Sequence, residues 1–130
     1  SEIANRGRTI VRENPLAPLG RLLMFGDSFG WGLAPFFTAA FQRFVFVHST
    51  TPDRIILEQE RPDAVLTECT ERFVIEGPRK LGSFKVTDVA RHKFKRAPAA
   101  EQERLRSLYE AKAASGTEPF YSSLFLESVT

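Results

Sequence analysis

The stretch that decides the fold is residues 21–30, which read RLLMFGDSFG. Four apolar residues follow the first arginine, and such a continuous run is typical of a strand buried on both faces of a parallel sheet. The five residues 26–30 include two glycines and predict a tight turn. Apolar residues then recur at helical spacing, so residues 31–42 are expected to form an amphipathic helix with Pro35 in its first turn.

The same alternation of strand and helix continues downstream. Residues 44–47 predict a second buried strand, and residues 63–67 a third. Between them, Thr51 as a cap and Pro52 at the first helical position predict a helix that stops at Pro62. Strand–helix–strand units with connections this short require right-handed crossovers and a parallel sheet. The expected fold class is therefore α/β, with a three-layer, flavodoxin-like parallel sheet.

The segments that flank these units give weaker signals. Residues 9–11 predict a short strand and residues 98–115 a helix, whereas the Lys/Arg-rich stretch 91–96 is expected to be solvated. We therefore divide the chain into two parts. Residues 1–78 form an α/β core with the turn, and residues 79–130 form a basic loop and helix that complete or flank the same domain.

Composition excludes several classes of protein. The 130 residues suit one domain or a piece of one, and a net charge of +2 is too small to favour a nucleic-acid partner. No stretch approaches the roughly 18–20 apolar residues of a membrane span, and a single cysteine excludes an intrachain disulfide. Residues 1–78 carry a net charge of −2 and residues 79–130 a net charge of +4, so the second part favours an anionic partner.

The Gly26–Gly30 turn is the feature that favours chemistry. Ser28 is expected at the carboxyl end of a parallel strand, where ligands bind in open α/β sheets. An oxyanion formed by attack of Ser28 on an ester would be held by the Ser28 amide and a neighbouring amide. Gly26 is expected to permit the turn and Gly30 a close approach of substrate. The Asp27 carboxylate is expected to accept backbone amide protons and to hold the turn rigid.

Two other interpretations of this turn remain open. The five residues also satisfy the Gly-x-Ser-x-Gly pattern of the α/β-hydrolase nucleophile elbow. Alternatively, they form a structural turn with Ser28 as a helix cap.

A resemblance to a known family favours one interpretation. Gly-Asp-Ser directly after the first hydrophobic strand is the first signature block of the SGNH hydrolases. More closely, residues 14–73 resemble the alginate acetylation proteins and related exopolysaccharide O-acetyltransferases, in the carboxyl-terminal part of their catalytic domain. The resemblance covers about half of the chain and rests on residues 14–15 (NP), 23–29 (LMFGDSF), 46–49 (FVHS), 60–65 (ERPDAV) and 71–73 (ERF).

The resemblance implies serine-dependent acyl transfer on a carbohydrate, in an SGNH-type sheet and in a periplasmic or extracytoplasmic setting. O-acetylation of an exopolysaccharide is the preferred form, and ester hydrolysis by a carbohydrate esterase is the alternative. A second alternative is a binding or assembly module that has lost the chemistry. The expected partner is a carbohydrate, including an anionic polysaccharide, and no cofactor is expected.

The general base is the missing part. In the family an Asp-x-His pair lies upstream of the serine, and this chain has no such pair. We expect the pair on a segment that precedes Ser1 in a longer parent enzyme, or else its loss in a degenerate homologue, so that this chain alone is weakly active or inactive. Within the chain, His48 follows the second core strand and is the candidate base. His92 comes four residues after Asp88, so the two would share a face if they lie on a helix.

Three further residues are candidate substrate ligands. Glu68 and Arg72 follow the third core strand and are expected at the same edge of the sheet as Ser28. Arg72 would bind a sugar carboxylate or form a surface ion pair. Trp31 would stack on a sugar ring or cap the core. Two histidines and one cysteine, scattered along the chain, predict no metal site.

Overall fold

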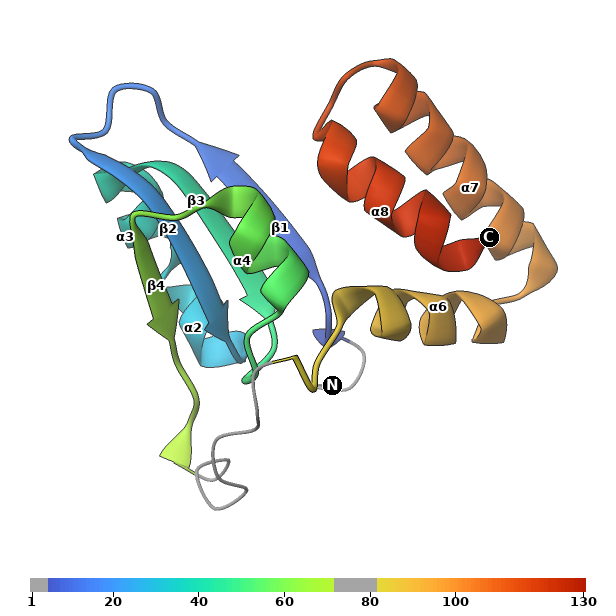
Figure 1. Ribbon diagram of the computed structural model, residues 1–130, viewed down its shortest axis with the longest axis horizontal. Coiled ribbons are helices and arrows are strands. Elements are labelled where there is room, and N and C mark those ends of the chain that lie inside the picture. The colour runs from blue at the N-terminus through green and yellow to red at the C-terminus, as the bar shows by residue number, and fades with distance from the viewer. Residues whose placement is uncertain (1–4, 72–81) are drawn as a thin grey trace. The chain divides into compact units, whose positions relative to one another are not determined.

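The structure, a computed structural model, describes residues 5–71 and 82–130 (Figure 1). The chain forms two compact units, Ser1–Lys85 and Val86–Thr130. Each unit has its own packed interior and is described by itself.

The first unit is built on an open, four-stranded mixed sheet with the strand order β1-β3-β2-β4. Strand β2 is parallel to both β3 and β4, which confirms the expected α/β class and its parallel core. Strand β1 pairs with β3 in the antiparallel direction, so the sheet is mixed, whereas an all-parallel sheet was expected. The connection from β1 to β2 is short, so the chain reverses direction between them, because parallel strands need a crossover of a dozen or more residues. Since β3 runs parallel to β2, β1 is antiparallel to β3. The strands are β1 (Thr9–Glu13), β2 (Leu19–Gly26), β3 (Phe41–His48) and β4 (Ala64–Thr67).

Helices cover both faces of this sheet. The short helices α2 (Ser28–Gly32) and α3 (Ala34–Ala40) lie on one face, and α4 (Arg54–Glu60) lies on the other (Figure 1). One crossover runs from β2 to β3, and the other runs in the opposite direction, from β3 past β2 to β4. Crossovers of the same right hand that run in opposite directions place their helices on opposite faces of the sheet. The first unit is therefore compatible with a three-layer α/β fold.

The helix predicted over residues 31–42 has different limits in the structure. It begins at Ser28, because the Asp27 side chain accepts a hydrogen bond from the Phe29 amide and caps the helix. It breaks at Leu33, which ends α2 and precedes α3. Pro35 explains the break, because a proline ring clashes with the carbonyl of the residue four positions earlier and allows only a new first turn. Strand β3 then begins directly at Phe41.

The predicted cap of α4 was also wrong. Asp53, not Thr51, caps the helix, and its Oδ1 accepts the amides of Ile55 at 2.8 Å and Ile56 at 3.3 Å. Thr51 instead belongs to a buried turn, in which its amide donates to the Ser49 hydroxyl. Asp is among the strongest N-cap residues, and Asp53 directly precedes the first residue of α4, so the helix begins after Asp53 and not after Thr51.

The core lies on both faces of the two central strands. On the face under α2 and α3, the half-buried rings of Trp31, Phe37 and Phe41 pack against a buried cluster. Side chains alternate along a strand, so the intervening residues face α4, where Ile56 is fully buried. The buried cluster under α2 and α3 consists of Leu22, Met24, Ala34, Phe44 and Phe46.

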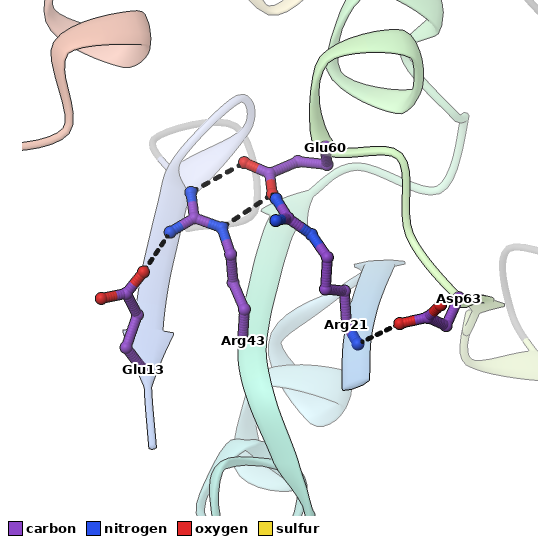
Figure 2. A network of polar contacts seen from close by, with 5 residues as sticks. All are labelled: Glu13, Arg21, Arg43, Glu60 and Asp63. Atoms are coloured by element: carbon purple, nitrogen blue, oxygen red, sulfur yellow. Dashed lines mark hydrogen bonds and ion pairs between the residues drawn. The ribbon is translucent and has the colours of Figure 1, made fainter. Parts of the chain in front are cut away.

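A polar network closes the amino end of the parallel strands (Figure 2). Glu60, the last residue of α4, is buried and accepts two hydrogen bonds from Arg43, at 2.8 and 2.9 Å. Arg21 also donates to Glu60 at 2.9 Å, and Arg43 reaches Glu13 of β1 at 2.8 Å. The Asp63 carboxylate accepts the Arg21 backbone amide at 2.7 Å. The network thus joins α4 to strands β1, β2 and β3.

The second unit consists of three helices. The stretch 91–96, expected to be solvated, lies on α6, where its basic side chains are exposed but Phe94 is buried. The predicted helix over 98–115 is confirmed as α7, whereas α8 was not predicted. Phe125 of α8 stacks on Tyr109 with ring centroids 4.0 Å apart and meets Phe94 edge-on at 6.0 Å. The helices are α6 (Val86–Arg96), α7 (Ala99–Ala114) and α8 (Pro119–Val129).

Candidate active site

The turn that carries Ser28 lies at the carboxyl end of β2, the strand at which the strand order of the sheet reverses. Strand β3 lies on one side of β2 and β4 on the other, so the chain crosses over in opposite directions on the two sides. Open α/β sheets bind ligands at such a switch point, outside the carboxyl ends of the strands. Ser28 is exposed there, as the first residue of α2.

Asp27 holds the turn from inside. Its carboxylate is buried and accepts the Phe29 amide at 2.8 Å through Oδ1. Its Oδ2 accepts both the amide of Thr70, at 2.8 Å, and the hydroxyl of Thr70, at 2.9 Å. Burial alone would raise the pKa of Asp27, but these hydrogen bonds stabilise the charged form and hold the pKa below its ordinary value. The carboxylate therefore fixes the turn to the segment that follows β4.

Glu68, on the same segment after β4, contacts the same turn. Its Oε2 accepts the backbone amide of Asp27 at 3.2 Å, and its own amide donates to the carbonyl of Phe25 at 2.8 Å. Burial raises the pKa of Glu68, and repulsion from the Asp27 carboxylate raises it further. The two carboxyl groups are thus neighbours in a partly buried site, and as the pH rises Asp27 loses its proton before Glu68 does.

Glu68 also explains the two glycines of the turn. Neither Gly26 nor Gly30 has a positive φ, so the turn does not require glycine for its backbone conformation. A Cβ atom at Gly26 would lie 2.9 Å from Glu68 Oε2, and a Cβ atom at Gly30 would lie 2.6 Å from the same oxygen. The close approach that was expected for a substrate is therefore made, in this structure, by the chain's own carboxyl group.

His48 lies at the same edge of the sheet as Ser28. It pairs in register with Gly26 on the neighbouring strand and is buried. Its ring stands edge-on to Phe46, with centroids 6.1 Å apart, and Phe46 in turn packs against Trp31 of α2. His48 therefore lies at the edge of the sheet that carries Ser28, on the face that α2 covers.

Of the two other predicted substrate ligands, Trp31 and Arg72, the structure describes only Trp31. Trp31 is half-buried, its ring lies 5.6 Å from that of Phe46, and the guanidinium of Arg12 lies 5.8 Å above it. This contact with the core corresponds to the core-capping alternative, and sugar stacking stays a prediction. Arg72 falls outside the described residues.

The other histidine belongs to the second unit. His92 is exposed on α6, and the Asp88 carboxylate forms its ion pair with Arg91 at 3.3 Å. His92 instead has Arg96 as a neighbour, with ring and guanidinium nitrogens 3.5 Å apart.

Thr70 was missed by the sequence analysis. Its contact with Asp27 depends on the pairing of β4 with β2, which brings residues 43 positions apart together. The available signal was a polar run, residues 68–71, directly after a predicted strand at the edge that carries Ser28.

Within residues 5–71 and 82–130, no group of three or more His, Cys, Asp or Glu side chains is arranged to bind a metal ion. None of the helices in these ranges has the length and apolar character needed to cross a bilayer.

Comparison with known proteins yields no relative: no family model, curated protein or solved structure matches the chain significantly. The fold and the turn define an α/β protein with an open mixed sheet and a Gly-Asp-Ser turn at its switch point.

Proposed function

We propose that the chain carries the nucleophile part of an SGNH-type acyltransferase that O-acetylates a carbohydrate, with Ser28 as the nucleophile. The observation that carries the proposal is the position of an exposed serine at the switch point of the sheet, on a turn that Asp27 holds by three hydrogen bonds. A rigid turn that presents a hydroxyl to solvent is what a covalent acyl intermediate needs.

The reaction takes place in two displacements. The Ser28 hydroxyl oxygen attacks the carbonyl carbon of an acetyl ester while its proton passes to a base. The bond from the carbonyl carbon to the leaving alcohol breaks, and that alcohol takes up the proton. The oxygen of a sugar hydroxyl then attacks the acetyl carbonyl carbon while its proton passes to the base. The bond from that carbon to the Ser28 oxygen breaks, and the Ser28 oxygen takes up the proton. Attack by water in place of the sugar hydroxyl would give simple hydrolysis. His48 is the base that this chain supplies to the proposal, because it shares the edge and the face of the sheet with α2.

The test is acetylation of Ser28 itself. The full chain is incubated with p-nitrophenyl acetate, and the peptide that contains residue 28 is followed by mass spectrometry. We expect a gain of one acetyl group on Ser28 and a release of p-nitrophenol that falls at least about tenfold in Ser28→Ala. Ser107→Ala, which removes an exposed serine on α7, is the matched control and should release p-nitrophenol at the unmodified rate.

Two results would separate the alternatives. Acetyl groups that appear on an added oligosaccharide indicate a transferase, whereas acetate in solution alone indicates an esterase. Equal rates for Ser28→Ala and the unmodified chain would contradict the catalytic proposal and favour a carbohydrate-binding module.

A further inference from the structure

Strand β4 is attached to β2 by an acidic side chain at each of its ends. At the amino end, the Asp63 carboxylate accepts the backbone amide of Arg21 at 2.7 Å. At the carboxyl end, the Glu68 carboxylate accepts the backbone amide of Asp27 at 3.2 Å. Backbone hydrogen bonds complete both attachments, from Asp63 to the carbonyl of Arg21 and from Glu68 to that of Phe25.

Each of these acids lies against a glycine of β2. A Cβ atom at Gly20 would collide first with the Asp63 carboxylate, and a Cβ atom at Gly26 first with Glu68 Oε2. The two ends of β4 are therefore built alike, but only one of them lies at the edge that carries Ser28.

The end that holds Glu68 has one further contact. Its Oε2 also lies 2.6 Å from the position that a Cβ atom at Gly30 would take, so the carboxyl group fills the space between the start of the turn and the helix α2. Ser28 stands between these two glycines in the chain. The position of its hydroxyl relative to the sheet thus depends on what occupies this space.

We propose that Glu68 is a positioning residue for Ser28: its carboxyl group, seated between Gly26 and Gly30, sets the position of the nucleophile turn relative to β4. The inference rests on the proposed function, and the substrate-binding role expected for Glu68 stays a prediction beside it. The contacts of Glu68 are with the backbone of the turn, so it acts on the reaction through Ser28.

Loss of this carboxyl group would leave a gap beside two glycines, and the turn would settle toward it. A displacement of about 1 Å at a reacting atom can cost about a hundredfold in rate. Glutamine has the same shape and retains an acceptor oxygen for the Asp27 amide, so it should hold the turn in place. Alanine should not.

The experiment compares the two ends of β4 in the full chain. The rate of Ser28 acetylation by p-nitrophenyl acetate and the midpoint of thermal unfolding are measured for Glu68→Gln, Glu68→Ala, Asp63→Asn and Asp63→Ala. We expect Glu68→Ala to slow acetylation at least about tenfold, Glu68→Gln to restore it to within about threefold, and both Asp63 variants to leave it within about twofold. Rates are compared at temperatures where every variant is folded.

A second experiment tests the contact between Glu68 and Gly26 by thermal unfolding, without measuring acetylation. Gly26→Ala should lower the unfolding midpoint of the unmodified chain. The decrease should be smaller in a chain that also carries Glu68→Ala, because Glu68 Oε2, the atom nearest to the new Cβ, is then absent. Gly20→Ala should lower the midpoint equally with and without Glu68→Ala.

The outcomes distinguish the two proposals. If Glu68→Ala and Asp63→Ala slow acetylation equally, or if Gly26→Ala costs the same in both backgrounds, Glu68 does not position the turn. If Ser28 takes up no acetyl group in the unmodified chain, catalysis by this chain fails, and the positioning role fails with it.

Discussion

At the scale of single residues, Asp27 and Glu68 are neighbouring carboxyl groups whose pKa values move apart, that of Asp27 downward and that of Glu68 upward. Hydrogen bonds from Phe29 and Thr70 favour the carboxylate form of Asp27, whereas burial and that carboxylate favour the acid form of Glu68. Two carboxyl groups in contact commonly separate their proton affinities in this way.

This arrangement predicts how stability depends on pH. A folded-state pKa of Glu68 above its ordinary value of 4.5 means that its contribution is fully present below 4.5 and is lost as the pH rises through the raised value. A glutamine at position 68 cannot ionise. The unfolding midpoint of Glu68→Gln should therefore rise relative to that of the unmodified chain as the pH is raised from about 4. Thermal unfolding followed by circular dichroism at several pH values measures the difference, and a constant difference would contradict the prediction.

The sequence predicted only part of this site. The role of Asp27 in the turn was accessible because its capping bond reaches just two residues along the chain. The inward orientation of Glu68 was not accessible, because it depends on the register of β4 against β2, and the two residues are 41 positions apart. The sequence shows an acid after a strand, but not that its carboxyl group accepts the backbone amide of Asp27.

At the scale of elements, capping residues decided where the helices begin. The type and order of the elements from residue 21 to residue 67 were predicted correctly, because buried strands and amphipathic helices differ in period. The limits were not, since Asp27 and Asp53 cap earlier or later than expected. Helix α8 was missed because its apolar residues spread around the helix, so it shows no clear polar face.

The capping role of Asp53 gives a prediction for α4. Asp53→Ala should lower the free energy of unfolding by about 1 kcal/mol, because the Ile55 and Ile56 amides lose their acceptor. Glu58→Ala, at an exposed position of the same helix, should change it by less than about 0.5 kcal/mol. Urea unfolding measures both, and equal effects would show that the cap contributes nothing.

At the scale of the whole molecule, the two units carry different natural probes. The single tryptophan, Trp31, lies in the first unit, and both tyrosines, Tyr109 and Tyr121, lie in the second. Tryptophan fluorescence and the near-ultraviolet signal of tyrosine therefore report on the units separately.

These two probes can test the contribution of the Glu60 network to the stability of the first unit. Glu60→Ala should lower the stability of the first unit by about 3–5 kcal/mol, because it leaves Arg43 without its buried partner. The tryptophan transition should shift more than the tyrosine transition. Glu13→Ala, which removes the exposed partner of Arg43, should cost about 0–1 kcal/mol. Coincident shifts of both transitions in Glu60→Ala would show that the two units unfold as one.

The contact of Glu68 with Gly26 and Gly30 also restricts how this sequence can evolve. Any larger residue at position 26 or 30 collides first with the carboxyl group at position 68. A shorter side chain at position 68 therefore makes room for a larger residue at position 26, whereas at position 30 the Met24 side chain, 2.8 Å from the same Cβ position, must also move. Among descendants of this chain, a residue other than glycine at position 26 should be accompanied by a small residue at position 68.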